Sequence, residues 1–563
     1  MPVAALRWAA AIVIAVAVAA AYRGTLAGPL IYDDHVWITR NPSVRRLWPI
    51  GGVLSPPAGS PVRGRPVLSL SLALNHAVSG DGAWSYHLAN LGIHILAALA
   101  LFGIATRTLA WRPGPFPSER DRVLAAFAVA LLWALHPLQT ESVTYVSQRS
   151  ESLMGLLYLM TLYCFIRGVQ SPRPGAWHVL SVSACLLGMA TKEVMVTAPL
   201  VVLAYDRTFV STGFREALRL RWRLYLGLAS TWLVLGWLAA GLGGRGVGLG
   251  LGFTWWAYGL SECWAVAHYL LLSVWPHPLV FDYGTSLVGS VGAALPWALV
   301  LAAIALAAAA AFLRRTFAGF AGVWFLAILA PASGVVPVAF QPMAEHRMYL
   351  PLAAVAALVV AGAWAWLGRR SLAPLLAAAL ALGILTGLRN GDYRSEAAIW
   401  GDTVARRPSN PRARMALGEA LAREGRHAGA AEQFCAAVRL DPGSLEAHRE
   451  LGLALFHMGR AGDALEEYRG VLPPTSDSAP LHYDTALALD GLGRIPEAIA
   501  EYTLAMRLDP DDADARIGLG SALTRAGRAG EARVQFEAAP ALRPGSSEAR
   551  DGLGRLGAPP AAR

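Results

Sequence analysis

The sequence has almost no lysine, few cysteines and few charged residues of any kind. Of its 48 basic residues only Lys192 is a lysine, and charged residues make up 15% of the 563-residue chain. The four cysteines show neither metal-ligand spacing nor a disulfide framework. A mean hydropathy of +0.43 excludes an ordinary soluble protein of this length. Arginine in place of lysine, together with abundant alanine and glycine, is typical of a GC-rich bacterial genome.

Long apolar runs are what the sequence has instead. The first one ends in Tyr22-Arg23-Gly24 without a small-residue cleavage site, so we expect a retained span and not a signal peptide. We do not expect a further run at 255–275, which contains Glu262 and His268, to cross the bilayer. The two short runs between 176 and 206 are open to an alternative interpretation as one long helix. Eleven runs are candidates to cross a bilayer, near 5–23, 84–106, 122–138, 151–167, 176–190, 193–206, 222–243, 290–313, 317–331, 349–367 and 371–388.

Clusters of arginine between the apolar runs predict the orientation of the chain. Lys and Arg are concentrated in the cytoplasmic loops of membrane proteins, so we expect every cluster on that side. The amino terminus then lies inside, the carboxyl terminus outside, and residues 24–83 form the first external loop. The pattern indicates membrane loops and no nucleic-acid partner. The clusters include Arg107 and Arg112, Arg120 and Arg122, Arg167 and Arg173, Arg207 to Arg223, Arg314 and Arg315, and Arg369 and Arg370.

An acidic pair, Asp33 and Asp34, stands in this external loop within I-Y-D-D-H-V-W-I-T-R-N. Two adjacent carboxylates can hold a divalent cation such as Mg²⁺ or Mn²⁺, or one can act as general base while the other positions it. A solvated turn is the plain alternative. The polar residues gather at one face of the bilayer, whereas a transporter places its key charges near the midplane. The sequence therefore favours a cavity that opens outward at the interface.

Ordered motifs accompany the acidic pair and carry a family resemblance. They are Y-D-D-H at 32–35, R-P-V-L-S-L-S-L-A-L-N at 65–75, Y-H-L-A-N-L-G-I-H at 86–94, H-P-L-Q-T-E-S-V-T-Y-V-S-Q-R-S-E at 136–151, T-K-E at 191–193 and E-H-R-M-Y-L-P at 345–351. Together they resemble the transmembrane and tetratricopeptide-repeat O-mannosyltransferases and their bacterial relatives, in the GT-C glycosyltransferase superfamily. The resemblance implies a polyprenyl phosphate monosaccharide as donor, mannose as sugar, external transfer with inversion, and an essential role for Asp33 and Asp34.

Further polar residues of the external face complete the candidate site. A lipid phosphate that leaves with negative charge must meet fixed cations. As alternatives, Arg65 and Arg149 snorkel to headgroups, Lys192 pairs with Glu193, and Glu345 pairs with Arg347. Two interpretations apply to His87, His94 and His136, which form either a metal cluster or hydrogen-bonded structural groups. The predicted donor-phosphate and substrate-binding residues are Arg65, His87, His136, Glu141, Arg149, Lys192, Glu193, Glu345 and Arg347.

A period of 34 residues appears after Arg389. Gly-Arg pairs begin at 425, 459, 493 and 527, and an aromatic residue follows each pair at Phe434, Tyr468, Tyr502 and Phe536. This period predicts a tetratricopeptide array over 409–556, four repeats plus a cap. Residues 391–408 are expected as a linker with a leading helix, and 557–563 as a disordered tail. The concave face of such an array indicates a protein or peptide partner, with a solubilising appendage as the alternative.

The predicted architecture is all-α, with a GT-C-type membrane domain of about eleven spans over residues 1–390 followed by a tetratricopeptide α-solenoid. The predicted function is a glycosyltransferase of the bacterial inner membrane that moves a sugar from a polyprenyl phosphate to a hydroxyl acceptor, expected to be a protein, with the repeats on the periplasmic side. The alternative is a non-catalytic repeat scaffold for envelope assembly.

Overall fold

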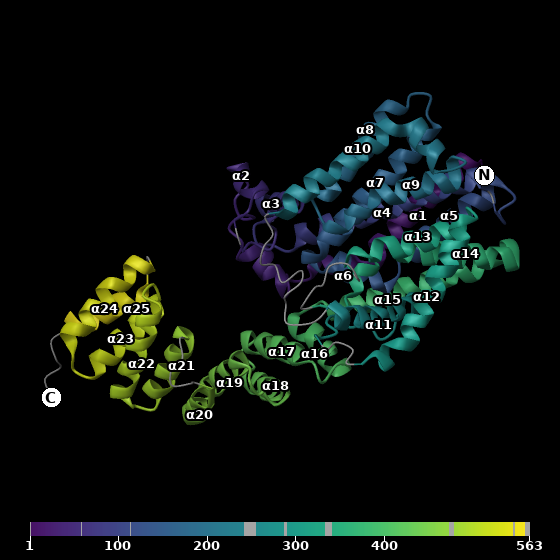
Figure 1. The fold of residues 1–563 in the computed structure, drawn as a ribbon. Coiled ribbons are helices and arrows are strands. Elements are labelled where there is room, and N and C mark those ends of the chain that lie inside the picture. Colours follow the sequence, from purple (N-terminus) through teal and green to yellow (C-terminus); the bar gives the residue numbers. More distant parts are fainter. Residues whose placement is uncertain are drawn as a thin grey trace. The chain divides into compact units, whose positions relative to one another are not determined.

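The computed structural model describes residues 2–57, 59–112, 114–240, 255–285, 290–332, 341–471, 478–543 and 546–557. Within these ranges all regular structure is helical, which confirms the all-α prediction. The chain divides into two compact units, Met1–Arg406 and Arg407–Arg563 (Figure 1). The helix expected to lead into the repeats, α16 (Glu396–Arg406), falls in the first unit.

Four helices form the centre of the first unit. They are α1 (Val3–Ala21), α4 (Trp84–Trp111), α5 (Glu119–Ala134) and α7 (Arg149–Gln170), and α4 packs against the other three (Figure 1). Helix α5 is buried along most of its length because α14 (Leu352–Leu367) and α15 (Leu372–Asp392) also cover it.

Six helical segments of the described chain are long and apolar enough to cross a membrane. A seventh is possible if Glu119–Ala134 and Pro137–Thr144, which are bent by 55°, form one span. The expected eleven spans are not confirmed, because α8 (Pro174–Met189) and α13 (Phe317–Leu329) are shorter than the roughly 20 residues of a full crossing. The six are α1, α4, Val146–Gln170, α10 (Phe214–Ala240), α12 (Val291–Leu313) and Leu352–Asp392.

The two stretches with uncertain crossings form distinct helices. Helix α8 ends at Met189, and a 3₁₀ turn at Glu193–Thr197 leads into α9 (Ala198–Tyr205). The stretch at 255–275 forms α11 (Trp255–Val274), which is not among the six candidate spans. Its acidic residue, Glu262, is buried and takes part in an ion pair described below.

Paired helices make up the second unit, as the 34-residue period predicts. The repeated glycines Gly425, Gly459, Gly493 and Gly527 have φ between +74° and +78°, a left-handed conformation that suits glycine at the turn between the paired helices. Residues 558–563 of the predicted tail lie outside the described residues. The helices are α17 (Pro411–Arg423), α18 (His427–Leu440), α19 (Leu445–His457), α20 (Ala461–Val471), α21 (Ala479–Gly491), α22 (Ile495–Leu508), α23 (Ala513–Arg525), α24 (Ala529–Leu542) and α25 (Ser547–Gly557).

Candidate functional site

The carboxylate of Asp34 is fully buried and is held on both oxygens. Oδ1 accepts hydrogen bonds from the backbone N–H of Ser147 at 2.7 Å and from its hydroxyl at 2.5 Å, and Oδ2 accepts from the N–H of Ile31 at 3.1 Å. Burial raises the pKa of Asp34 to about 7. These contacts tie the segment that contains Asp34 to a turn 113 residues further along the chain, so Asp34 fixes the position of that segment.

Asp33 is only half-buried and has different neighbours. Its backbone N–H donates to the hydroxyl oxygen of Tyr145 at 3.2 Å, and the same phenol is hydrogen-bonded to the Asp33 side chain. The two carboxylates of the pair are therefore unequal, because Asp34 is enclosed by protein donors whereas Asp33 is the more accessible.

An aromatic cluster surrounds this turn. The ring of Phe281 lies at its centre, 5.1 Å from the rings of both Tyr145 and Trp400 and 5.9 Å from that of Tyr393. Tyr32 completes the cluster, with its ring 4.9 Å from Trp400. Tyr145, Phe281, Tyr393 and Trp400 are all buried, so these rings pack against one another and keep water from this side of the acidic turn.

Glu396, the first residue of α16, holds the acidic turn from another side. Its Oε1 accepts a hydrogen bond from the N–H of Tyr32 at 2.6 Å and lies 2.9 Å from Nε2 of His35. Tyr32 has φ of +48°, which residues other than glycine rarely adopt. The bond to Glu396 helps to hold this conformation. Sequence reasoning missed Glu396, because it follows the last apolar run in a stretch that carries no motif.

Glu141 and Glu345 are both buried acids that accept hydrogen bonds from the protein. Glu141 accepts a hydrogen bond from the N–H of His346 at 2.9 Å, and its other oxygen is 2.7 Å from Nδ1 of that residue. Glu345 accepts from the N–H of Val280 at 2.5 Å and from the hydroxyl of Tyr283 at 2.8 Å. Burial raises the pKa of Glu345 to about 7 and lowers the pKa of His346.

The candidate cations form ion pairs with acids distant in the sequence. Lys192 lies 2.6 Å from Glu151, so the ion pair that the structure shows is not the alternative pairing with the adjacent Glu193. Glu193 instead accepts two hydrogen bonds from Arg65, at 3.0 and 3.1 Å. The guanidinium of Arg65 also lies 5.9 Å from the ring of Trp37, in the same loop as the acidic pair.

Arg347 likewise pairs at long range. Its Nη1 lies 3.3 Å from Glu262 of α11. The ion pair that the structure shows is therefore not the alternative one with Glu345, two residues earlier. Coulombic interactions also join Glu141 to Lys192, Arg347 and Arg389. The structure therefore places Lys192, Arg347 and Arg389 within electrostatic range of Glu141, and Arg389 is a residue that sequence reasoning did not single out.

Arg149 is fully buried and does not snorkel to headgroups. It donates to the side-chain oxygens of Asn90 and Asn75, each at 2.6 Å, and to the carbonyls of Ser71 at 3.1 Å and Tyr86 at 2.9 Å. These partners belong to α3 (Pro66–Ser79) and α4, so Arg149 of α7 joins three helices. We interpret it as a positioning residue.

The histidines occupy buried structural positions. His94 bonds to the hydroxyl of Tyr349 and the carbonyl of Ala134, each at 3.0 Å, and His136 bonds at 3.2 Å to the carbonyl of Ser273. His87 is buried beside Gly28. Among the described residues no three or more His, Cys, Asp or Glu side chains form a metal-binding group. Both oxygens of Asp34 already accept hydrogen bonds from protein donors, so Asp34 offers less to Mg²⁺ or Mn²⁺ than a free carboxylate does, and we derive no step through a metal.

Characterised proteins match the chain over about a third of its length. Human protein O-mannosyl-transferase TMTC2 is 30% identical over 203 residues, which are 33% of this chain and 22% of the human protein. Drosophila melanogaster protein O-mannosyl-transferase Tmtc2 is 29% identical over 214 residues, 36% of this chain and 22% of that protein. The chain is related to the protein O-mannosyl-transferases. Since it spans about a fifth of the length of these relatives, the match concerns one part of each.

The repeats are matched separately. The tetratricopeptide repeat family matches residues 387–445 and 430–479, and again 491–556, which confirms that the chain contains tetratricopeptide repeats. Among solved structures, MamA from Desulfovibrio magneticus RS-1 is 22% identical with a TM-score of 0.25, over 27% of this chain and 85% of that chain. The predicted combination of O-mannosyl-transferase motifs with tetratricopeptide repeats is thus confirmed.

Proposed function

We propose that this protein is a membrane glycosyltransferase of the GT-C type that moves mannose from a polyprenyl phosphate to a hydroxyl group of a protein, with inversion. The relation to protein O-mannosyl-transferases supports the reaction class. The observation that carries the proposal is the unequal environment of the acidic pair, in which a fixed Asp34 stands beside a more accessible Asp33. One rigid and one reachable carboxylate is what a positioned general base requires.

Asp33 acts as the general base in the proposed reaction. The acceptor hydroxyl gives its proton to Asp33 while its oxygen forms a bond to the anomeric carbon. The bond from that carbon to the phosphate oxygen breaks on the opposite face, and its electron pair leaves with the polyprenyl phosphate. Positioned base catalysis contributes on the order of 10²–10⁴ in rate. Asp34 and Tyr145 hold the backbone on either side of Asp33.

Arg65 and Lys192 are the cations that we assign to the leaving phosphate. Both side chains are partly exposed, 16% for Arg65 and 14% for Lys192, and an acid partner holds each of them in place. A fixed cation stabilises the charge that develops on the phosphate without reorganisation during the reaction. Arg149 and Arg347 are more deeply buried and act by positioning.

The repeats and the bilayer supply the remaining partners. A tetratricopeptide array presents an extended concave surface, which we assign to a protein or peptide acceptor. The arginine clusters favour a cytoplasmic position for the loops that contain them. We assign about eleven crossings of a bacterial inner membrane to the chain, which places the repeat unit on the periplasmic side.

Transfer from radiolabelled polyprenyl phosphate mannose to envelope proteins tests the proposal. We compare membranes that hold equal amounts of wild type, Asp33→Asn and Asp34→Asn. Asp33→Asn should lower the rate at least 100-fold. Asp81→Asn is the matched control, since Asp81 is an exposed acid of the same external segment. A rate of sugar transfer in Asp33→Asn equal to that of the wild type would refute the assignment of Asp33 as the general base. A wild type that transfers no sugar from any of a panel of lipid donors would support the scaffold alternative instead.

A further inference from the structure

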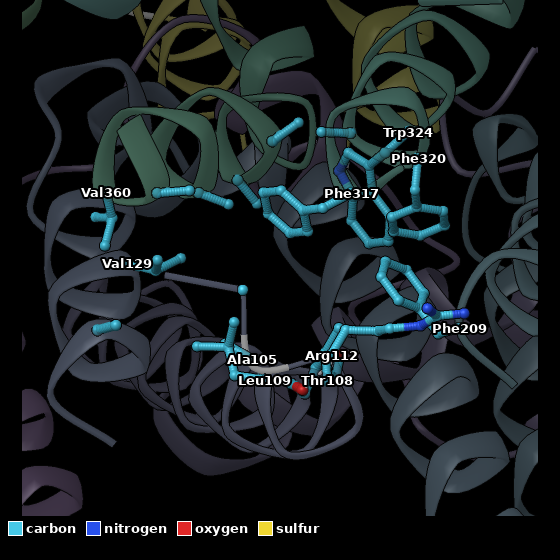
Figure 2. Close-up of a pocket in the computed structure, with 18 of the residues that line it drawn as sticks. Ala105, Thr108, Leu109, Arg112, Val129, Phe209, Phe317, Phe320, Trp324 and Val360 are labelled. Atoms are coloured by element: carbon cyan, nitrogen blue, oxygen red, sulfur yellow. Dashed lines mark hydrogen bonds between the residues drawn. The ribbon is translucent and has the colours of Figure 1, made fainter. Parts of the chain in front are cut away.

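An apolar cavity of about 150 Å³ lies between α4, α5, α13 and α14 (Figure 2). Ala105 and Leu109 line it from α4, Val129 from α5, Phe320 and Trp324 from α13, and Val360 from α14. Figure 2 shows the aromatic rings of α13 facing the side chains of α4 across the open space. The cavity lies near the carboxyl end of α4, the end that Arg112 follows.

Carbon atoms make up almost the whole wall of the cavity, and the hydroxyl groups that line it already have hydrogen-bond partners in the protein. Thr108 Oγ1 donates to the carbonyl of Ile104 at 2.8 Å and lies 2.6 Å from the hydroxyl oxygen of Tyr205. An apolar cavity of about this size stays dry and takes up small apolar molecules. Left empty, its wall would lose dispersion contacts. The surrounding bilayer offers a ligand that can supply those contacts.

Arg112 gives the cavity a charged mouth. It follows the last residue of α4, is exposed, and lines the cavity (Figure 2). Gly114 and Pro115, which are also exposed, line the cavity beside it. None of the described residues that line the cavity is acidic. A cation at the mouth and an apolar interior match an anionic headgroup and a hydrocarbon chain, and basic pockets between membrane helices are known sites for anionic lipids.

We propose that this cavity binds one acyl chain of an anionic phospholipid, whose phosphate contacts Arg112. The site is distinct from the proposed transfer site, since Arg112 follows the far end of a 28-residue helix, about 42 Å long, whose other end holds His87 beside Gly28. A bound chain fills the space between α13 and α4 and stabilises the packing of the four helices.

Photolabelling of the full-length protein in phosphatidylcholine nanodiscs tests this site. The probe is phosphatidylglycerol with a mid-chain diazirine, and the comparison probe is phosphatidylcholine with the same chain. We expect phosphatidylglycerol adducts on peptides from α13 and α14. Arg112→Gln should lower these adducts at least threefold. Ala357→Phe, which fills the cavity from α14, should lower them at least fivefold. Ala309→Phe on the exposed face of α12 is the matched control and should change nothing.

Three outcomes would overturn the proposal. Equal labelling of these peptides by both probes would show no preference for an anionic headgroup. Unchanged labelling in Ala357→Phe would place the chain outside the cavity. Stronger labelling by a diazirine polyprenyl phosphate would assign the cavity to the isoprenoid carrier. If Ala357→Phe does not fold, the headgroup comparison and Arg112→Gln still decide.

Discussion

The backbone N–H of Tyr32 donates a hydrogen bond of 2.6 Å to Glu396, a residue 364 positions further along the chain. The ring of His35 meets the same carboxylate oxygen at 2.9 Å. Asp33 and Asp34 lie between these two contacts. Helix α16 therefore fixes both ends of the acidic turn, although it follows the last apolar helix.

We call the two contacts of Glu396 with Tyr32 and His35 the Glu396 clamp, and its removal should slow sugar transfer. Hydrogen bonds to charged groups contribute about 1.5–3 kcal/mol, so we expect Glu396→Ala to lower kcat about tenfold or more, with a smaller effect on the KM for the lipid donor. Glu396→Gln keeps an oxygen acceptor and should lose less. Initial rates with labelled donor measure both effects. Glu119→Ala, at an exposed acid paired with Arg7, is the control. A normal rate in Glu396→Ala would show that the clamp is dispensable.

The environment of Asp34 predicts the pH dependence of transfer. Its pKa is raised to about 7, so the carboxylate takes up a proton as the pH falls through 7, and we expect activity to fall with it. Ser147→Ala removes a donor that favours the ionised form and should move this acidic limb to higher pH. Profiles of kcat/KM against pH measure the shift, with Ser152→Ala as control. Identical profiles for wild type and Ser147→Ala would exclude Asp34 as the titrating group.

The same raised pKa has a consequence for stability. An Asp in an unfolded chain ionises near pH 3.9, below the pKa of Asp34 in the folded protein. The folded state therefore binds the proton more tightly. The contribution of Asp34 to stability is greatest below about pH 4 and is lost as the pH rises through 7. Asp34→Asn should flatten this part of the dependence in thermal unfolding of the purified protein.

Arg149→Lys should destabilise the membrane unit although it keeps the charge. A lysine ammonium cannot reproduce the planar set of donors that reaches Asn90, Asn75 and two carbonyls. Unsatisfied buried acceptors cost about 1–3 kcal/mol each, so we expect a clear fall in Tm in detergent. Arg167→Lys should cause a smaller change, because Arg167 stacks on Trp177 and lysine retains a cation over the ring. Equal changes in Tm for the two variants would contradict this role.

Two glycines of the repeats should respond in opposite ways to alanine. A Cβ at the buried Gly452 would collide with the ring of Tyr468, so Gly452→Ala should destabilise the pair α19 and α20 by about 1–3 kcal/mol. At Gly470 a Cβ meets nothing within 4 Å, and Gly470→Ala should stabilise the helix by up to about 1 kcal/mol. Hydrogen exchange of α19 and α20 peptides in the full-length protein separates the two. Faster exchange in both variants would refute the packing argument.

Local patterns in the sequence predicted the features that a short stretch of chain determines by itself. The period of 34 residues located the repeats, and the position of Asp33 and Asp34 after the first apolar run located the acidic turn. Pairing partners could not be predicted in this way, because tertiary packing selects them. Lys192 meets Glu151 instead of its neighbour, and Glu396 stands where no periodicity or motif marks it. The number of spans could not be predicted either, since the apolar helices α8 and α13 are shorter than a full crossing of the bilayer requires.

Helix α16 also determines where this chain can be divided. It contributes Glu396 and Trp400 to the surroundings of the acidic turn, yet it lies beyond Asp392, where the last apolar helix ends. Exchange of repeat arrays between relatives, by recombination or by design, would preserve the turn only if the junction falls after Arg406. The point at which the chain can be divided is thus after α16, one helix beyond the end of the last apolar helix.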